Sequence, residues 1–535
     1  MKHIRVLILT AALAACTSRP EPEYIPPPPP PPPPVQYAPP PPPAADIINS
    51  LPQSFASKLT QMPPEERERY QAIEVNPVKR VAEAPVSTFS VDVDTGSYAN
   101  VRRFLTQGRM PPADAVRVEE MLNYFRYDYP LPADRARPFS VTTNVTTTPW
   151  NPNTRLLRIG LRGYDLARRE RPPANLVFLV DTSGSMNEPD KLPLVKASLS
   201  LLADQLQPHD RVSIVAYAGS AGLVLEPTND PARVKAALAQ FEAGGSTAGG
   251  QGLELAYATA RATRIADGIN RIILATDGDF NVGVSDTRQL LDMVRRYRDD
   301  GITLTTLGFG QGNYNEAMME QVADAGNGNY SYIDSAMEAQ KVLDQELSST
   351  LFTIAKDVKI QVEFNPAFVS EYRLIGYENR LLREEDFSND AVDAGDIGAG
   401  HMVTALYEIV PVGARGWLPE RRYEANRPPA AAPASRELAF VKLRYKLPGE
   451  AESRLIEHPV PSAAIAAAGP PAGDMAFAAA VAAYGQKLKG DARIGGYGWD
   501  SIRRLAGPTQ DFWRQEFLKL VDLAAAQQPA APAPQ

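Results

Sequence analysis

Oxygen-bearing side chains stand at three places near the middle of the chain, each after a glycine pair or an apolar run. They are Asp181, Ser183, Ser185, Thr247 and Asp277. Carboxylate and hydroxyl oxygens suit a hard cation, whereas zinc and copper favour nitrogen and sulfur ligands. We therefore predict that these five side chains form a site for Mg²⁺ or Mn²⁺.

The segment that carries these residues alternates apolar strands with amphipathic helices. The expected strands lie at 176–181, 212–217, 272–276 and 302–309. Apolar residues with helical spacing lie between them, at 195–206, 234–241 and 290–297. This alternation predicts an α/β domain with a parallel sheet that is covered by helices on both faces. Ligands of such sheets bind beyond the carboxyl ends of the strands, where Asp181 and Asp277 stand.

The ordered set D-x-S-x-S, T and D-G resembles the metal-ion-dependent adhesion site of von Willebrand factor type A domains. The resemblance implies a Rossmann-like domain with a mostly parallel central sheet, whose antiparallel edge strand would lie at 222–225. It also implies that the first four of the five side chains surround one divalent cation, while Asp277 contacts it directly or through water. In such a site, an acidic side chain of a protein partner takes an open position on the metal.

Strand-like alternation returns on both sides of this domain. Expected strands precede it at 86–94 and 139–148, and others follow it at 358–364, 372–377, 402–412 and 438–447. Neither set closes a sheet by itself, and exposed sheet edges promote aggregation. We therefore expect both sets to pair in one β-rich companion domain into which the α/β domain is inserted. Two independent small domains are the alternative.

These patterns divide the chain into seven segments. They are a signal peptide at 1–16, a Pro-rich tether at 17–84, a β-rich region at 85–172, the type A domain at 173–353, a second β-rich region at 354–465, a helical C-terminal region at 466–525 and a tail at 526–535. The helical region has apolar spacing typical of helices at 476–488, 499–505 and 511–526. The Pro/Ala composition of the tail predicts disorder.

The amino terminus has the features of a secretory signal. A basic start is followed by an apolar stretch at 6–13 that is too short to span a bilayer. Leu13-Ala14-Ala15-Cys16 resembles the bacterial lipobox, so we expect Cys16, the only cysteine in 535 residues, to be lipidated. We expect a lipid-anchored protein of the cell envelope, in the outer membrane and facing the periplasm. Proline runs at 26–34 and 39–43 would hold its body off the membrane.

Charge and spacing argue against several other functions. A net charge of −8 disfavours nucleic acid as a partner, and export places the chain away from ATP. Asp94-Thr95-Gly96-Ser97 matches the catalytic turn of aspartic proteases, which need a second such turn that the chain lacks. Asp92 and Asp94 resemble a phosphatase nucleophile loop without its downstream lysine and acidic pair. We expect both matches to be a structural turn.

Beyond the metal motif, the chain resembles bacterial type A domain lipoproteins that carry an N-terminal associated region and a C-terminal region of unknown function. The matching flanks lie at 88–129 and 495–523. The resemblance implies binding rather than catalysis, so we expect cation-dependent binding of an unidentified protein that offers an acidic side chain. A metal-dependent hydrolase of the envelope, phosphatase- or protease-like, is the alternative.

Overall fold

The computed structural model describes residues 68–278, 287–346, 349, 351–419, 421 and 435–528. The predicted signal peptide, Cys16, the proline runs and the end of the tail lie outside the described residues. Within the described part of the chain, no helix has both the length and the apolar character needed to cross a membrane.

The central α/β domain is built on a six-stranded sheet of order β10-β9-β8-β5-β6-β7. Its strands are β5 (Ala174–Asp181), β6 (Arg211–Tyr217), β7 (Ala221–Thr228), β8 (Ile269–Thr276), β9 (Thr303–Phe309) and β10 (Tyr330–Ile333). All neighbours are parallel except β6 and β7, which confirms the predicted antiparallel edge. Leu176 and Phe178 of β5 enter the core on one face of the sheet, and Val177 and Leu179 enter the core on the other. A strand buried on both faces needs such a continuous apolar run.

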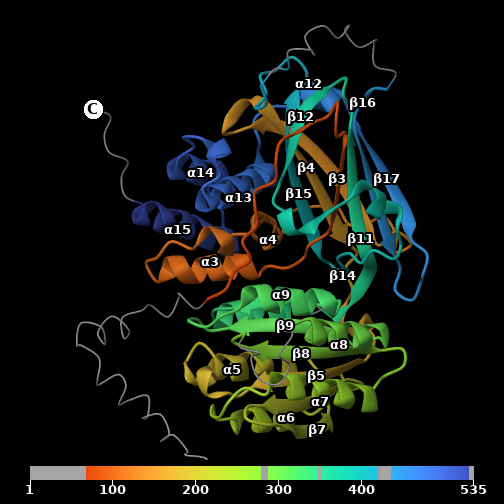
Figure 1. Cartoon of the computed structure of the whole chain (residues 1–535), viewed down its shortest axis with the longest axis vertical. Coiled ribbons are helices and arrows are strands. Elements are labelled where there is room, and N and C mark those ends of the chain that lie inside the picture. Colours follow the sequence, from red (N-terminus) through yellow and green to blue (C-terminus); the bar gives the residue numbers. More distant parts are fainter. Residues whose placement is uncertain are drawn as a thin grey trace, which may run out of the picture. The chain divides into compact units, whose positions relative to one another are not determined.

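Helices cover both faces of this sheet (Figure 1). They are α5 (Leu192–Ala203), α6 (Pro231–Ala239), α7 (Gly249–Ala262), α8 (Thr287–Asp299), α9 (Glu316–Ala325) and α10 (Ala336–Gln340). α5 and α6 share one core, and α7 and α8 share the other. The helices predicted at 195–206, 234–241 and 290–297 correspond to α5, α6 and α8. The sequence did not predict α7, because its first turn is rich in glycine.

Two antiparallel sheets form the companion domain and enclose one core. Their orders are β1-β12-β15-β4-β3 and β13-β2-β11-β16-β17. The strands are β1 (Lys79–Arg80), β2 (Val86–Ser90), β3 (Phe139–Thr148), β4 (Asn151–Gly163), β11 (Thr353–Phe364), β12 (Val369–Ile375), β13 (Leu381–Leu382), β14 (Ile397–Gly398), β15 (Met402–Pro411), β16 (Glu437–Lys446) and β17 (Arg454–Pro461). β2 pairs with β11, and β4 pairs with β15, so strands from both sides of the α/β domain share each sheet. The predicted insertion is therefore confirmed.

A helical layer joins the two ends of the described chain. It consists of α3 (Gly96–Thr106), α4 (Val118–Asn123), α13 (Gly473–Lys489), α14 (Trp499–Ala506) and α15 (Phe512–Gln527). Figure 1 shows the early helices α3 and α4 beside the late helices α13 and α15, and all of them contribute to one core.

The shorter helical turns are η2 (Ala113–Ala115), η3 (Arg168–Glu170), η4 (Gly184–Asn187), η5 (Lys341–Gln345), η6 (Glu378–Arg380), η7 (Glu384–Ser388), α12 (Ala463–Ala466) and η8 (Ala492–Ile494).

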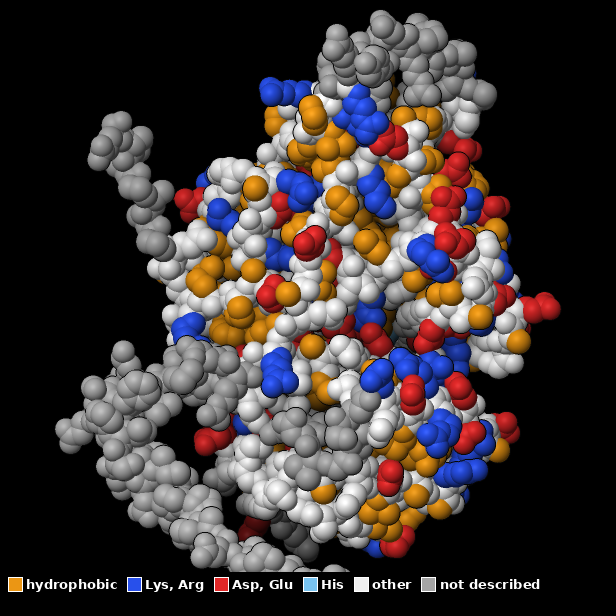
Figure 2. Space-filling view, viewed as in Figure 1, with side chains coloured by type: hydrophobic (Ala, Val, Ile, Leu, Met, Phe, Trp, Pro, Cys, Tyr) orange, Lys and Arg blue, Asp and Glu red, His pale blue; other side chains and the backbone are white. Residues whose placement is uncertain are grey.

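Charges are mixed rather than sorted on one face of the described residues. On the face that Figure 2 shows, acidic and basic side chains of the described residues alternate over both the α/β domain and the companion domain. This face has no continuous basic stripe of the kind that follows a nucleic-acid backbone.

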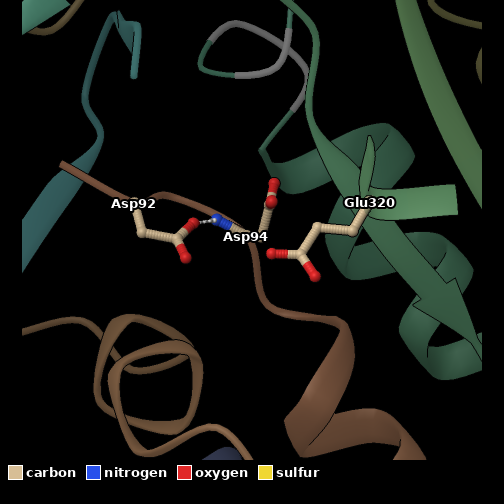
Figure 3. A group of neighbouring side chains, drawn as sticks. All are labelled: Asp92, Asp94 and Glu320. Carbon is tan, nitrogen blue, oxygen red and sulfur yellow. Dashed lines mark hydrogen bonds between the residues drawn. The ribbon is translucent and has the colours of Figure 1, made fainter. Parts of the chain in front are cut away.

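Three carboxylates converge where the α/β domain meets the companion domain. Asp92 and Asp94 come from the loop after β2, and Glu320 comes from α9 (Figure 3). Ligand oxygens of the three side chains lie within 4.8 Å of one another, and all three residues are buried. Arg380 lies among them, with Nε 3.2 Å from Asp92 Oδ2 and Nη2 3.2 Å from both Asp94 Oδ2 and Glu320 Oε1. A guanidinium therefore supplies the positive charge that this cluster requires.

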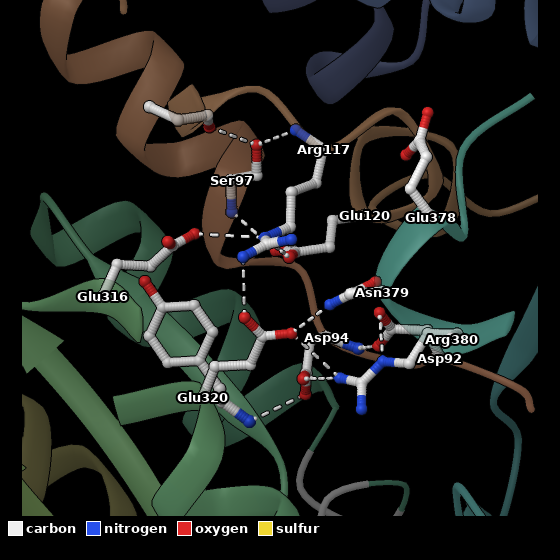
Figure 4. A network of polar contacts seen from close by, with 12 residues as sticks. Asp92, Asp94, Ser97, Arg117, Glu120, Glu316, Glu320, Glu378, Asn379 and Arg380 are labelled. Carbon is white, nitrogen blue, oxygen red and sulfur yellow. Dashed lines mark hydrogen bonds and ion pairs between the residues drawn. The ribbon is translucent and has the colours of Figure 1, made fainter. Parts of the chain in front are cut away.

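A second arginine extends this junction (Figure 4). Arg117 Nη2 lies 2.8 Å from Glu320 Oε2, and its Nε lies 3.4 Å from Glu316 Oε1 and 3.3 Å from Glu120 Oε1. The buried acids still outnumber the two arginines, and Glu119, also buried, has no hydrogen bond to its carboxylate within the described structure. Burial raises the pKa of Glu316 and of Glu320 to about 7, even though the charge of Arg117 opposes the shift.

We expect the protein to become less stable as the pH rises from about 6.5 to 8. An acid whose pKa is about 7 when folded, against 4.5 as its ordinary value, binds more protons in the folded state between those values. Its contribution to the free energy of unfolding is therefore fully present below about pH 4.5 and declines above that value, and its last part is lost as the pH rises through 7. Burial also lowers the pKa of His401 to about 3. Below about pH 6.5, this histidine therefore makes the protein more stable as the pH rises, which is opposite to the effect of the acids. Thermal unfolding in EDTA across this window measures the dependence.

The variant Glu316→Gln isolates one of these acids. A neutral amide needs no proton, so the variant should show a weaker pH dependence and should be at least as stable as wild type at pH 8. The exposed Glu226→Gln serves as the matched control. A pH dependence in Glu316→Gln equal to that of wild type would contradict the assignment.

Removal of Arg380 should be strongly destabilising. Arg380→Ala leaves three buried carboxylates without their shared cation, which should reduce the free energy of unfolding by about 3–5 kcal/mol at pH 8. Chemical denaturation measures this loss. The control is Arg135→Ala, which breaks an exposed ion pair with Glu170 and should leave the denaturant concentration at the unfolding midpoint unchanged. Equal midpoints for the two variants would show that the junction does not depend on Arg380.

Candidate metal centre

Strand pairing brings the two predicted aspartates to one edge of the central sheet. β5 and β8 are parallel neighbours, with Val180 opposite Ala275. Asp181 is the last residue of β5, and Asp277 follows β8. Because parallel strands present their carboxyl ends at the same edge, the two carboxylates become neighbours.

Backbone hydrogen bonds hold the other predicted residues at this edge. Ser183 and Ser185 lie in the loop after β5, and their hydroxyl oxygens are 3.1 Å apart. The loop that carries Thr247 is joined to them, because Gly184 N donates to Gly245 O at 3.0 Å and Gly244 N donates to Thr182 O at 2.9 Å. Gly245 has φ +80°, a conformation that favours glycine. The structure therefore brings all three predicted segments together.

Asp181 is held in a defined orientation. Ser183 N donates to its Oδ1 at 2.9 Å, while Thr276 Oγ1 and Tyr217 OH donate to its Oδ2 at 2.7 and 3.2 Å. The residue is fully buried. Burial, and next the negative charge of Asp277, raise the pKa of Asp181 to about 6. Two neighbouring buried carboxylates repel each other, so a cation between them would be stabilised.

Among the described residues, Lys191 and Asn313 are partners of Asp277 that the sequence did not reveal. Lys191 Nζ and Asn313 Nδ2 each donate to its Oδ2 at 3.0 Å, and Lys191 Nζ also donates to Asn313 Oδ1 at 2.8 Å. Lys191 immediately precedes α5, and Asn313 lies in the loop after β9. The glycine-rich residues 308–312, G-F-G-Q-G, directly precede Asn313. This glycine-rich run after β9 is the signal in the sequence that could have pointed to Asn313.

The residues at this edge fit a divalent hard cation. The predicted set offers two carboxylates and three hydroxyls, which are the oxygen ligands that Mg²⁺ and Mn²⁺ prefer. The buried proximity of Asp181 and Asp277 is the structural observation that favours a cation here. The acid cluster at Asp92, Asp94 and Glu320 differs, because Arg380 contacts all three of its carboxylates.

The contacts of the two enzyme-like motifs are structural. Asp92 Oδ1 accepts a hydrogen bond from Asp94 N at 2.9 Å, and Asp94 Oδ1 accepts one from Tyr330 N at 2.8 Å. Ser97 N donates to Glu120 Oε2 at 2.8 Å, and Ser97 Oγ donates to Ala115 O. This turn starts α3 and attaches it to the α/β domain, as a structural turn would.

Comparison with known families identifies three regions. The model described as von Willebrand factor matches residues 64–158, and the model of the von Willebrand factor type A domain matches 175–345. The model described as uncharacterized protein YfbK, C-terminal, matches 349–527. The second match coincides with the α/β domain, which therefore has a protein-interaction or adhesion type of function. Domains of this type are generally not enzymes, and they commonly bind a divalent metal.

Several individual proteins are similar to the chain. A solved von Willebrand factor type A protein from Catenulispora acidiphila is 17% identical, with a TM-score of 0.39, and the match covers 75% of this chain and 88% of that one. The uncharacterized protein sll0103 of Synechocystis is 33% identical over 187 residues, which are 35% of this chain and 43% of the relative. The uncharacterized protein YfbK of Escherichia coli is 49% identical over 468 residues, which are 85% of this chain and 81% of the relative.

The match to the Escherichia coli protein covers most of both chains, and the three family models match regions between residues 64 and 527. The chain therefore belongs to the YfbK family of bacterial proteins, which combine a von Willebrand factor type A domain with a family-specific C-terminal region.

Proposed function

We propose that this protein binds a protein partner through a divalent cation held at the edge of its type A domain. The observation that carries the proposal is the burial of Asp181 next to Asp277 at the carboxyl ends of β5 and β8, with Ser183, Ser185 and Thr247 in the loops beside them. Buried acids without an added cation would destabilise this edge. A bound Mg²⁺ or Mn²⁺ would supply a Lewis-acidic position for an oxygen ligand.

The ligand best suited to this position is a carboxylate. Asp181 and the three hydroxyls would hold the cation, with Asp277 contacting it directly or through water. Mg²⁺ usually retains several waters, so an acidic side chain of a partner can replace one of them. The loops after β5 and before α7 expose Gly184, Ser185 and Ser246, which leaves the edge accessible to such a partner.

Binding accounts for the arrangement better than hydrolysis. A hydrolase needs a group that is free to move protons near the metal. The lysine nearest to the predicted set, Lys191, instead donates to both Asp277 and Asn313. The phosphatase- and protease-like motifs at 92–97 lie in the junction that Arg380 neutralises. We therefore place the protein among binding proteins rather than enzymes.

The proposal includes a location in the cell envelope. Lipidation of Cys16 would anchor the chain, and the proline runs at 26–34 and 39–43 would act as a spacer. The protein would face the periplasm from the outer membrane. A partner with an exposed acidic side chain would then come from the envelope, and neither ATP nor nucleic acid would be required.

The metal centre is tested by removing one ligand. Full-length wild type in detergent should bind Mg²⁺ and Mn²⁺ in calorimetric titrations, and Asp181→Ala should weaken binding by more than the 10- to 100-fold that changes around a metal site typically cause. Asp204→Ala, at an exposed pair with Lys235, should bind as wild type. Envelope proteins captured by wild type should be lost with EDTA and with Asp181→Ala. Metal-independent capture that the variant retains would refute the proposal.

The anchor is tested by mass spectrometry of the mature protein. We expect the chain to begin at Cys16 with an added lipid mass, and Cys16→Ser to leave the membrane fraction, because the lipid supplies the membrane affinity. Thr17→Ser serves as the control for a change beside the attachment point. An unmodified terminus, or a wild-type protein found only in the soluble fraction, would exclude the anchor.

A further inference from the structure

Lys191 places a positive charge inside the candidate metal centre. Its side chain is 5% exposed, and its Nζ lies 3.0 Å from Asp277 Oδ2. Asn313 Oδ1 accepts from the same ammonium at 2.8 Å and thereby fixes its direction. Lysine is rarely buried unless it is paired, so the position requires an explanation.

The surrounding structure is shaped to hold this side chain. Gly310 in the loop after β9 has φ +72°, and a Cβ there would lie 2.3 Å from Lys191 Cγ and 2.4 Å from its Cε. Only a glycine lets the loop pass this close to the lysine stem. The same loop is attached elsewhere, since Gly312 N donates to Glu68 Oε1 at 2.9 Å. The loop after β9 therefore packs against Lys191 and is itself held by Glu68.

The charge of Lys191 changes the net charge that the centre would have after a cation has bound. Asp181 and Asp277 alone carry two negative charges, which one divalent cation would neutralise. With Lys191 included, the centre carries one negative charge before the cation binds and one positive charge afterwards. A charge in a buried site is costly unless it is paired, because the local dielectric is low. The loaded centre would thus be unfavourable until an anion reached it.

We propose that Lys191 couples cation binding to carboxylate binding. It weakens the binding of the cation alone and favours the binding of the cation together with a carboxylate. This inference rests on the proposed metal centre and assigns a role to a residue outside its ligand set. It predicts that the partner group is anionic, because a neutral hydroxyl or amide would leave the positive charge in place. Coupling is reciprocal, so the cation and the carboxylate must each strengthen the binding of the other.

The test measures Mn²⁺ binding to the full-length protein by calorimetry, with acetate as the carboxylate probe and with acetamide as its neutral counterpart, at constant ionic strength. Wild type should bind Mn²⁺ more tightly in acetate than in acetamide. Lys191→Met should bind Mn²⁺ roughly tenfold more tightly than wild type without acetate, and should lose most of the acetate effect. Lys191→Arg, which keeps the charge, should retain the coupling. Lys235→Met removes an exposed lysine, so its Mn²⁺ affinity and its acetate effect should equal those of wild type.

The outcomes separate this inference from the proposed function. Absence of Mn²⁺ and Mg²⁺ binding in wild type and in Lys191→Met would refute the metal centre itself. Wild-type binding of Mn²⁺ that acetate does not strengthen would refute the coupling, and this measurement requires no variant to fold. Equal affinities and equal acetate effects in wild type and Lys191→Met would show that the lysine is only a structural partner of Asp277. Thermal unfolding in EDTA checks that Lys191→Met is folded.

Discussion

Burial of guanidinium groups between separate parts of the chain is the constraint on which this structure depends. Arg380 joins the loop after β2 to α9, and Arg117 joins α4 to the same helix. Arg102 of α3 reaches Glu338 of α10 and Glu516 of α15. A buried charge without its partners is strongly destabilising, so these contacts favour one docked arrangement of the inserted domain. The two chain connections at β4 and β11 would not fix that arrangement by themselves.

The protein solves the same electrostatic problem in two different ways. At the junction, Arg380 contacts all three clustered carboxylates, and burial raises the pKa of Glu316 and Glu320 to about 7, so bound protons offset part of the remaining charge. Acids gathered at the sheet edge are neutralised only in part, since Lys191, among the described residues, forms its ion pair with Asp277 and not with Asp181. The first cluster is therefore suited to holding domains together, and the second to receiving a cation.

The helical layer and the segment before β1 also reach the metal edge. Glu68 accepts a hydrogen bond from Gly312 N, and Gln107 at the end of α3 donates to Gln311 Oε1 at 2.9 Å. These contacts hold the loop that carries Asn313, a partner of Asp277. Because the C-terminal helices share a core with α3, the family-specific C-terminal region supports the same arrangement. The type A domain of this chain is thus one part of a continuous structure.

The sequence alone determined the features that depend on neighbouring residues. The apolar run of β5 predicted a strand buried on both faces. The places of Asp181 and Asp277 after two such runs predicted that their loops meet, because parallel strands share one carboxyl edge, while Thr247 was assigned through the motif resemblance. Only the tertiary structure decided which distant charges meet. Arg380 contacts Asp92 across 288 positions, and Lys191 contacts Asp277 across 86. Such pairs leave no periodic pattern in the sequence, since their partners are selected by packing of the complete fold rather than by spacing along the chain.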